Sequence, residues 1–590
     1  MARRKSISNR NKAKALKRWT NKNEPVVQCS DSTTVDNSEC IVACDASQST
    51  ETKPNLRQQK LEASNSADQF ESTSSECKYI VVDCTVLSDL VQDLKCNDCH
   101  NKTLKIDIGK EQNGFAHDIQ LKCIQCEDIK KSIYTSKRLE NKTKRPAFDV
   151  NQRMTQAFIR LGKGHAGLQH FSMIMNMYCM SKYSFNEHSK LLLGATTDVV
   201  ANILTDIRSE VRGAYADLIV DGEIPPILDI GVSYDGTWLT RGHSSMYGVG
   251  CVIDILTGYV IDYQVMSKSC RKCVHARQRY KNPQDFKIWY DIHKQECDIN
   301  HTGSSGAMEM EAAIKMWNRS QDFGLRYTSL LSDGDAKTFN KLCALKPYGP
   351  EHKIEKQECV NHVGKRLGTA LRTVVLDSGK QGQQLGGRAH GSLKSVTINK
   401  LQKYYTKAIY RNKGDTEATK TAIYATLLHS ISTDKNPSIR NVHLAKTLER
   451  CLAKILPVYQ KLASDSLLKR CTECRTQNAN ESLHGMIWRN FPKEMFASKR
   501  RIDIAVGQAI CDFNVGTTET VIKTQKQAGL SPGRTTVKLG VKRDSNRVMK
   551  AKSRSNKAYQ RYRRSVKLAR LRSMEAAKVR EGPTYEAGLF

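Results

Sequence analysis

The chain has 590 residues, with 94 Lys and Arg against 60 Asp and Glu, so its formal net charge is +34. This length allows roughly three or four domains of ordinary size. The sequence shows no apolar leader core and no run of about 18 apolar residues, which argues against a secreted or membrane-spanning protein. We therefore expect an intracellular protein whose 20 cysteines stay reduced. Closely paired cysteines are then better interpreted as metal ligands than as disulfides.

The excess positive charge is concentrated near the two ends of the chain. Residues 1–23 contain nine Lys or Arg and no acid, and residues 534–572 contain fifteen against one acid, Asp544. Such blocks are typical of polyanion binding and of nuclear import, although a solvated tail that only aids solubility has the same composition. We predict a disordered basic segment and linker over residues 1–76, a disordered basic tail over residues 511–590, and a nuclear location.

Residues 77–130 contain two Cys-x-x-Cys pairs, formed by Cys96 and Cys99 and by Cys123 and Cys126. Between the pairs, two runs of alternating hydrophobicity flank Asn113-Gly114, which is a strong hairpin signal. Tetrahedral Zn²⁺ is commonly held by four such thiolates. The segment therefore predicts a zinc-ribbon-like module, and the alternative is a set of unpaired surface cysteines.

Helical periodicity over residues 146–221 gives way to strand patterns. The run 227–238 predicts a strand, residues 246–267 predict a hairpin, a helix is expected from about Gly306, and residues 327–333 predict a fourth strand. The string EKQECVNHV can form a fifth strand before another helix. Three sequential strands, a helix and a fourth strand outline a mixed α/β sheet.

Three acids stand out around this sheet. Asp235 lies inside the first strand, where a charge is costly unless it is paired or binds a cation. Asp333 ends the fourth strand, where open α/β sheets place catalytic groups. Glu481 lies on a predicted helix, away from its apolar stripe. Each also has an ordinary interpretation, because Asp residues such as Asp335 often cap helices and a Glu in a first helical turn complements the helix dipole.

Taken together, an Asp on the first strand, an Asp after the fourth and a Glu on a later helix form the arrangement of RNase H-like nucleases and transposases. Such sites use two Mg²⁺ or Mn²⁺ ions roughly 3.5–4 Å apart in phosphodiester chemistry, and these ions prefer oxygen ligands. We predict a metal site at Asp235, Asp333 and Glu481, with Asp335 as a helix cap or reserve ligand.

A further set of metal-ligand residues interrupts the sheet between the third strand and the following helix. It consists of Cys270, Cys273, Cys297 and His301. The residue types and spacing predict another Zn²⁺ site. Because Lys and Arg surround it, we expect residues 270–301 to form a DNA-facing zinc knuckle.

Several strings resemble the Mutator-like transposase domain of eukaryotic DNA transposons: VSYDGTWLTRGHSSMYGVG, NHTGSSGAMEMEAA, LLSDGDAKTF, LKPYGP, KQECVNHVGKRLGTALR and QNANESLHGMIWRNFPK. The resemblance covers about residues 147–510. It implies an RNase H-like catalytic domain, here over residues 222–510, with a helical insertion at about 361–470. It also implies Asp235, Asp333 and Glu481 as a DDE triad.

The family carries a Cys-x-x-His signature after the second Asp, which matches Cys359 and His362 here. From this resemblance we infer that Cys471 and Cys474 join them on one structural Zn²⁺; alternatively, the two pairs pack separately in the core. RNase H uses a helix glutamate as an extra ligand, and Glu309 is the corresponding candidate, with a structural hydrogen bond as its alternative.

The resemblance implies a DNA transposase that binds double-stranded DNA at terminal inverted repeats and at the target, assembles as a homo-oligomer, and has no membrane partner. It would cut DNA strands and join the freed 3′ ends to target DNA. The alternative is a domesticated nuclear zinc-containing DNA-binding protein without catalysis. An RNA-directed nuclease ranks last, because the sequence shows no RNA-recognition module with paired aromatic residues.

Overall fold

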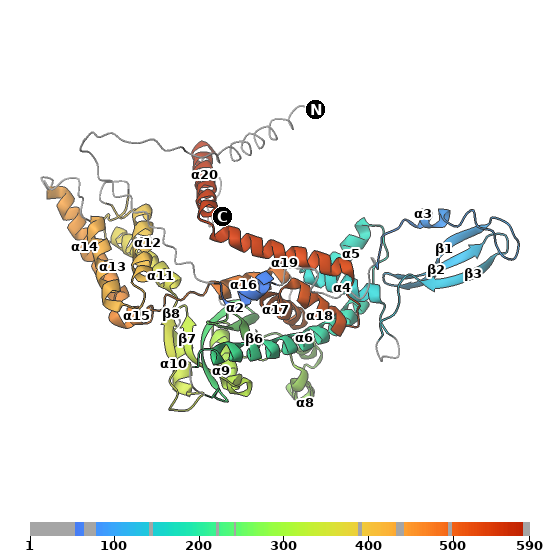
Figure 1. The fold of residues 1–590 in the computed structure, drawn as a ribbon, viewed down its shortest axis with the longest axis horizontal. Helices are drawn as coiled ribbons and strands as arrows, with labels where there is room; N and C mark the ends of the chain where they lie inside the picture. Colours follow the sequence, from blue (N-terminus) through green and yellow to red (C-terminus); the bar gives the residue numbers. More distant parts are fainter. Residues whose placement is uncertain are drawn as a thin grey trace, which may run out of the picture. The chain divides into compact units, whose positions relative to one another are not determined.

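The structure is a computed structural model that describes residues 54–63, 78–140, 146–219, 223–240, 244–334, 336–387, 392–431, 442–493 and 498–581 (Figure 1). All of them belong to the unit Pro54–Phe590. The basic residues 1–23, most of the predicted linker and the reserve ligand Asp335 lie outside the described residues. No helix in the described ranges is both long and apolar enough to cross a bilayer.

Part of the predicted disordered linker is a helix, α2 (Leu56–Ala63). Arg57 is buried, donates a hydrogen bond to the Phe513 carbonyl at 3.0 Å, and lies 4.0 Å above the centre of the Phe513 ring. A hydrogen bond and a cation–π contact offset the cost of burying a guanidinium. The prediction of disorder is therefore wrong for these residues, because a long-range contact orders them.

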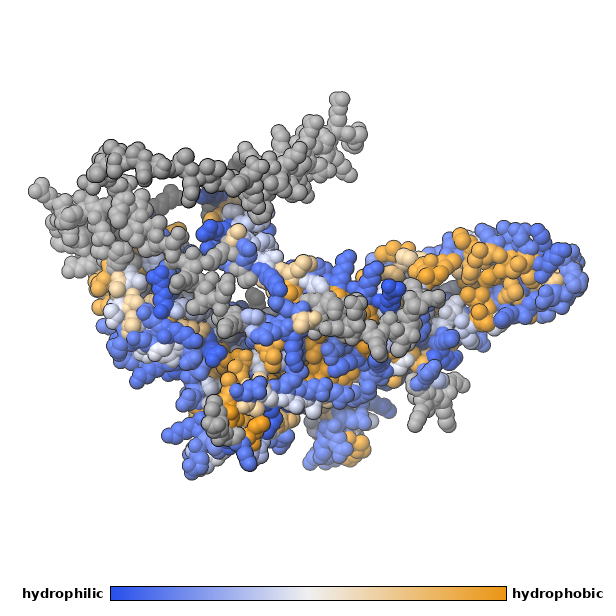
Figure 2. All heavy atoms as spheres, in the orientation of Figure 1, coloured by the Kyte–Doolittle hydropathy of each residue, from blue (hydrophilic) through white to orange (hydrophobic). Residues whose placement is uncertain are grey.

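The predicted ribbon module is an antiparallel sheet of three strands, β1 (Leu104–Asn113), β2 (Ala116–Cys123) and β3 (Asp128–Tyr134), preceded by the short helix α3 (Cys84–Asp89). The hairpin turns at Gly114, whose φ of 69° favours glycine. Strand β3 was not predicted. Hydrophobic side chains gather over this sheet and the segment before it, including the exposed Ile80, Leu90 and Ile133 (Figure 2).

The predicted helical region contains α4 (Asp149–Arg160), α5 (His165–Ile174) and α6 (Lys182–Ala216). Buried Leu192, Val199, Ile203 and Ile207 recur along α6 at helical spacing. This apolar stripe packs against the central sheet and the helix α17 (Lys499–Asn514). The helical prediction for this region is confirmed.

The central sheet has five strands: β4 (Leu228–Trp238), β5 (Tyr247–Asp254), β6 (Val260–Ser267), β7 (Leu325–Ser332) and β8 (Glu355–Glu358). Their order is β6-β5-β4-β7-β8; β5 and β6 run antiparallel to their neighbours, and β4, β7 and β8 are parallel. The mixed α/β sheet is confirmed. The fifth strand is shorter than the string that predicted it, because helix α11 begins at Val360.

Short helices connect these strands: α7 (Arg271–Arg279), α8 (Pro283–His293), η2 (Lys294–Glu296), α9 (Ala307–Arg319), η3 (Ser320–Phe323) and α10 (Ala336–Leu345). The first three form the predicted insert. Its two ends meet, because Asn300 and His301 donate backbone hydrogen bonds to the Ser267 carbonyl at 3.0 and 3.1 Å. The insert is therefore tied at its base to the end of β6.

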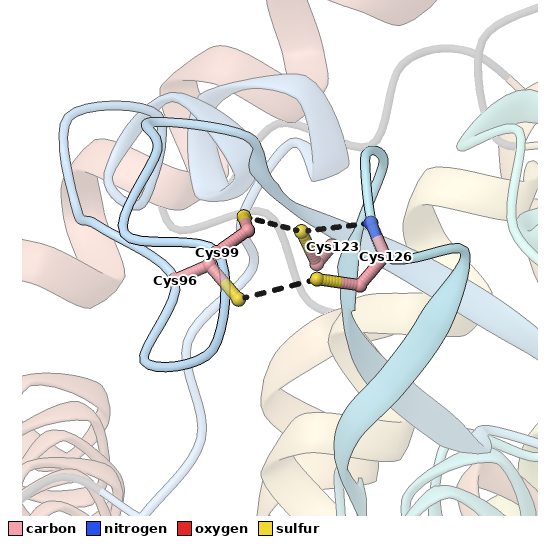
Figure 3. Close-up of side chains that lie close together, drawn as sticks. All are labelled: Cys96, Cys99, Cys123 and Cys126. Carbon is pink, nitrogen blue, oxygen red and sulfur yellow. Dashed lines mark hydrogen bonds between the residues drawn. The ribbon is translucent and has the colours of Figure 1, made fainter.

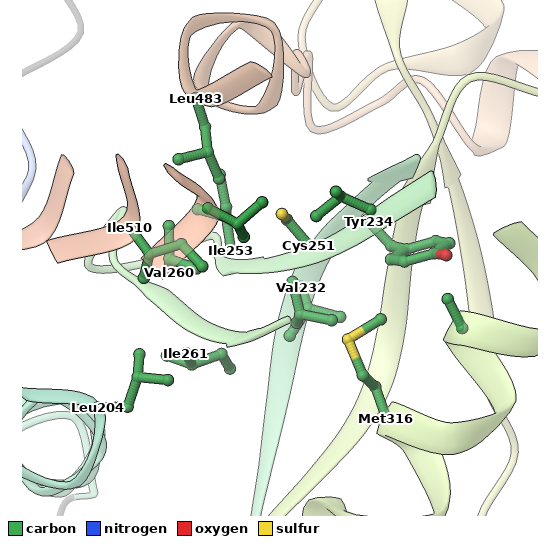
Figure 4. Close-up of a cluster of buried hydrophobic side chains, with 14 of the residues drawn as sticks. Leu204, Val232, Tyr234, Cys251, Ile253, Val260, Ile261, Met316, Leu483 and Ile510 are labelled. Carbon is green, nitrogen blue, oxygen red and sulfur yellow. The ribbon is translucent and has the colours of Figure 1, made fainter. Parts of the chain in front are cut away.

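The two faces of β4 are covered by different helices. Ser233 and Thr237 contact α16 (Asn478–Asn490), whereas Tyr234 contacts α9. Figure 4 shows Leu483 of α16 and Met316 of α9 approaching the buried cluster from opposite sides. Because successive side chains of a strand alternate, Asp235 projects from the face that α16 covers.

The predicted insertion is helical and has a hydrophobic core of its own. Its helices are α11 (Val360–Lys380), α12 (Ser395–Arg411), α13 (Thr416–Ile431), α14 (Val442–Leu462) and α15 (Asp465–Lys469). Leu367, Leu401, Tyr405 and Tyr459 are among the buried residues that hold these helices together. The helical insertion is confirmed.

The predicted C-terminal tail is helical through residue 581. Its helices after α17 are α18 (Thr517–Gln527), α19 (Arg534–Ser555) and α20 (Lys557–Glu581). The single acid of the basic block, Asp544, accepts hydrogen bonds from the backbone N–H groups of Thr517 and Thr518 at 2.8 and 2.9 Å. Arg547 donates to the Asp512 carbonyl. For residues 511–581 the prediction of a disordered tail is wrong, because a few inward residues dock the otherwise basic helix α19.

Candidate functional site

The register of two parallel strands brings Asp235 and Asp333 to the same level of the sheet. The last pair of β4 and β7 is Ser233 with Leu331, and each acid lies two residues farther along its own chain. Side chains two residues apart on a strand share a face, and neighbouring strands lie about 4.8 Å apart. Asp333 follows directly after Ser332, the last residue of β7, and is exposed.

Two buried amide side chains hold the start of α16 on β4. Gln477 donates to the Tyr234 carbonyl at 2.9 Å, and Asn480 accepts a hydrogen bond from the Ser233 hydroxyl at 2.6 Å. Glu481 is the next residue and is thereby brought to the strand that carries Asp235. The sequence prediction missed both amides, although their spacing of three residues on the buried side of a helix start was a usable signal.

The three acids are electrostatically linked. Burial, helped by the negative charges of Asp333 and Glu481, raises the pKa of Asp235 to about 7, while His362 acts in the opposite direction. The side chain of Asp235 is 19% exposed and that of Glu481 is 53% exposed. A solvent-facing group of carboxylates with mutual repulsion fits a hard divalent cation, which would supply the missing positive charge.

The carboxylates of Asp235, Asp333 and Glu481 do not form a tight cluster. Among the described residues, the sets of three or more metal-ligand residues whose donor atoms all lie within 4.8 Å of one another are two cysteine-rich clusters, so the carboxylate oxygens of the three acids do not all lie within this distance. Metal binding at the acids, with Mg²⁺ or Mn²⁺, therefore stays a prediction.

Two cations of α11 lie against Glu481. The His362 Nε2 atom and the Lys365 Nζ atom are each 3.5 Å from the Glu481 Oε1 atom. A hydrogen bond with Cys359 raises the pKa of His362 to about 9. Positive charge at α11 thus partly offsets the negative charge of the acids.

A second histidine lies on the buried side of the acids. The His484 Nδ1 atom is 3.7 Å from the Asp235 Oδ2 atom, and burial lowers the pKa of His484 to about 4. His484 is therefore neutral at neutral pH and packs against Asp235 without balancing its charge. The sequence prediction did not include this residue.

Glu309 lies on the other side of the strand. A Cβ atom at Gly236 would be 2.9 Å from the Glu309 carboxyl carbon, and Gly236 belongs to the face of β4 opposite that of Asp235. Its role as an additional ligand stays a prediction.

The first predicted zinc set is confirmed as a cluster with the ligands for one ion: Cys96, Cys99, Cys123 and Cys126 (Figure 3). The Cys96 and Cys126 sulfurs are 3.9 Å apart, and those of Cys99 and Cys123 are 3.6 Å apart. The Thr103 hydroxyl lowers the pKa of the Cys123 thiol to about 6. Four thiols within this distance fit tetrahedral Zn²⁺.

For the second predicted zinc set, the three cysteines are confirmed as members of one cluster, whereas its histidine is corrected. Cys270, Cys273 and Cys297 cluster with His293, whose Nε2 atom is 3.3 Å from the Cys270 sulfur. His301 is wrong as a ligand, because its ring contacts Glu311 and the Ser304 carbonyl. Helix α8 ends at His293 and brings this residue back to the cysteines at the start of α7. The sequence signal that we missed is the pattern His-x-x-x-Cys formed by His293 and Cys297.

The third predicted zinc set is wrong as one cluster. Cys359 interacts with His362 and with the backbone N–H of Gln477, whereas the Cys474 thiol donates to the Ile409 carbonyl at 3.5 Å. Cys471 is buried in the core of the insertion. The chain segments do meet, but through backbone hydrogen bonds from Glu358 to the Arg470 carbonyl and from Val360 to the Arg475 carbonyl at 2.9 and 3.2 Å.

The sequence model of the Mutator-like transposase family matches residues 78–455. The chain belongs to this family. The match covers more than half of this Mutator-like transposase, begins at the ribbon module, and includes Asp235 and Asp333. Glu481 lies beyond it, so its assignment depends on the position of α16. No curated protein matches the sequence. The family identifies a transposition protein that acts on DNA.

We predict that the described residues bind two Zn²⁺ ions, one at each cysteine cluster. Replacing His293 with Ala should remove or weaken one of them, because that ion would lose a ligand. The matched variant His301→Ala should keep both ions. Metal analysis of the purified proteins by mass spectrometry measures this, and zinc loss in His301→Ala but not in His293→Ala would contradict the corrected ligand set.

The raised pKa of Asp235 predicts a pH-dependent stability. Between about pH 4 and 7 the folded protein keeps this proton whereas the unfolded chain has lost it, so the free energy of unfolding falls as pH rises through this window. Asn at this position cannot ionise. The metal-free Asp235→Asn variant should therefore gain stability over the wild type with increasing pH, toward an upper limit of roughly 4 kcal/mol at pH 8.

Urea unfolding at pH 5 and pH 8, with and without Mg²⁺, measures this effect. Mg²⁺ should stabilise the wild type and the control Asp229→Asn, whose carboxylate pairs with Arg326 at 2.6 Å elsewhere on β4, but not Asp235→Asn. A gain in stability of Asp235→Asn that is equal at both pH values would contradict the prediction.

Proposed function

We propose that this Mutator-like transposase is a DDE-type enzyme that cleaves DNA strands at transposon ends and joins them to target DNA. The observation that carries the proposal is the convergence of Asp235, Asp333 and Glu481, from β4, the end of β7 and α16, on one face of the sheet. The strand order β6-β5-β4-β7-β8 also agrees with the RNase H-like fold that the sequence resemblance implies.

In the proposed reaction, water attacks a phosphorus atom of the DNA strand and the bond from phosphorus to the 3′ oxygen breaks. Water loses a proton, the 3′ oxygen gains one, and the products are a 3′ hydroxyl and a 5′ phosphate. In the second step the 3′ hydroxyl attacks a phosphorus atom of the target strand and loses its proton, while the bond from that phosphorus to the target's 3′ oxygen breaks and this oxygen gains a proton. Mg²⁺ or Mn²⁺, held by the three acids, would stabilise the charges that develop on the attacking and leaving oxygens.

Contacts that support α16 have a positioning role in this proposal. Gln477 and Asn480 fix the helix on β4, and Glu481 remains exposed to solvent, from which the DNA would approach. His484, itself mostly buried, packs against the Asp235 carboxylate.

Double-stranded DNA, at terminal inverted repeats and at the target, is the proposed partner. The ribbon would contact it, as would the outward side of α19, where Arg534, Lys538, Lys542 and Arg543 are exposed. Phosphate contacts would mainly set position, and base contacts would set specificity. Assembly as a homo-oligomer and a nuclear location are parts of the same proposal.

The second candidate function is a domesticated nuclear DNA-binding protein that keeps the fold without the chemistry. Two observations favour it: Glu481 already contacts two cations, and the three acids do not form a tight cluster.

A cleavage assay on duplex DNA from the ends of the element separates the two functions. The wild type should cleave with Mg²⁺ or Mn²⁺, and Asp235→Asn should lower the rate by roughly two to three orders of magnitude or more while leaving DNA affinity unchanged. The control Asp229→Asn should remain active. DNA binding without cleavage by the wild type at any Mg²⁺ or Mn²⁺ concentration would favour the second function, and cleavage of RNA alone would refute both.

We further predict that α19 contributes to the salt dependence of DNA binding. Replacing Lys538, Lys542 and Arg543 together with Ala should lower the slope of log affinity against log salt by up to about 2.7, because each lost phosphate contact lowers it by about 0.9. The control replaces the exposed Lys394, Lys400 and Lys403 of the insertion, with the same loss of charge. Equal slopes for the two variants would contradict a specific role for α19.

A further inference from the structure

Lys365 is a cation at the edge of the candidate active site with no role in the function proposed so far. Its Nζ atom lies 3.5 Å from the Glu481 Oε1 atom, and its side chain is 60% exposed. It lies three residues after His362 on α11, so the two cations share one side of the helix. Both approach the same oxygen of Glu481.

The neighbouring Arg366 is held differently. It forms an ion pair with the buried Glu358, and its guanidinium carbon lies 3.1 Å from where a Cβ atom of Gly334 would be. Arg366 therefore packs the loop after Asp333 against α11. Lys365, by contrast, contacts Glu481 as its one acidic partner in the part of the chain that the structure describes.

The contact between Lys365 and Glu481 is weak and reversible. Ion pairs between exposed side chains contribute little stability, because water screens them and both side chains lose freedom. The lysine ammonium is a compact charge with three donors on a flexible stem, so it can turn to another anion nearby. A divalent cation bound by Glu481 would repel this ammonium at such a short distance.

We propose that Lys365 neutralises Glu481 while no divalent cation is bound, and contacts an oxygen of the DNA phosphate at the site once the cation occupies Glu481. This inference rests on the proposed function and adds to it a phosphate-contacting residue. In the metal-free state Lys365 balances the charge of Glu481, and in the metal-bound state it balances the charge of the DNA phosphate. Negative charge at the three acids is therefore offset in both states.

For Lys365→Met, the proposal predicts that Mg²⁺ affinity rises and that the rate of DNA cleavage falls. Mg²⁺ affinity of the DNA-free protein should increase about two- to fivefold, because the competing ammonium is gone. At saturating Mg²⁺, DNA cleavage should become at least about tenfold slower, because a charged contact to the phosphate is lost. Damage to the fold would weaken both properties, so the opposite signs separate the proposed role from a structural one.

Isothermal titration calorimetry with MgCl₂ and single-turnover cleavage measure the two properties. Lys365→Gln serves as a second variant that keeps a polar side chain, and it should behave like Lys365→Met. The control is Lys380→Met on the same helix, whose lysine is 79% exposed and lies 3.5 Å from Asp377; both properties should match the wild type.

Unchanged or weaker Mg²⁺ binding by Lys365→Met and Lys365→Gln would overturn the proposal, as would unchanged cleavage at saturating Mg²⁺. These results leave the proposed function intact, since the wild type still binds Mg²⁺ and cleaves DNA. A wild type that neither binds Mg²⁺ nor cleaves DNA would instead overturn the assignment of the acids, and this inference with it.

Discussion

The contact between α16 and β4 is the constraint on which the candidate site depends. Two buried amides, Gln477 and Asn480, bond to the backbone and side chains of β4 beside Asp235. Because an unpaired buried amide is costly, these bonds fix the position of the helix along the strand. Glu481 thus reaches the aspartates although the whole helical insertion separates it from Asp333 in sequence. The insertion keeps its own core and leaves this contact undisturbed.

The balance between the three acids and the cations around them is the second constraint on the site. Burial is the main cause that raises the pKa of Asp235 to about 7, and repulsion from Asp333 and Glu481 adds to it. Helix α11 places the positive charges of His362 and Lys365 beside Glu481. The neutral His484 lies on the buried side and adds no charge there. Positive charge is therefore placed on the solvent side, where a cation and a DNA phosphate would enter.

The C-terminal helices show how few inward residues order a strongly basic segment. Asp544 satisfies backbone donors at the start of α18, which are otherwise unpaired at a helix N-terminus. Arg547 contacts Asp512 and Arg57 contacts Phe513, so α2 and α19 both meet the end of α17. The composition of such a helix is dominated by the many basic residues on its exposed side. The few residues that dock the helix are too few to change this composition, so composition alone does not reveal them.

Local patterns in the sequence determined much of this protein: the turn at Gly114, the Cys-x-x-Cys pairs, the apolar strand patterns of β4 to β7 and the periodicity of the helices follow from neighbours a few residues apart. Two of the acids could also be placed, because strand ends meet at one edge of a parallel pair. Tertiary structure decided that His293 rather than His301 joins the cysteines, and that Cys359 and Cys471 stay in separate environments. The reason is geometric, since sequence spacing does not tell which side chains face each other after the chain has turned back.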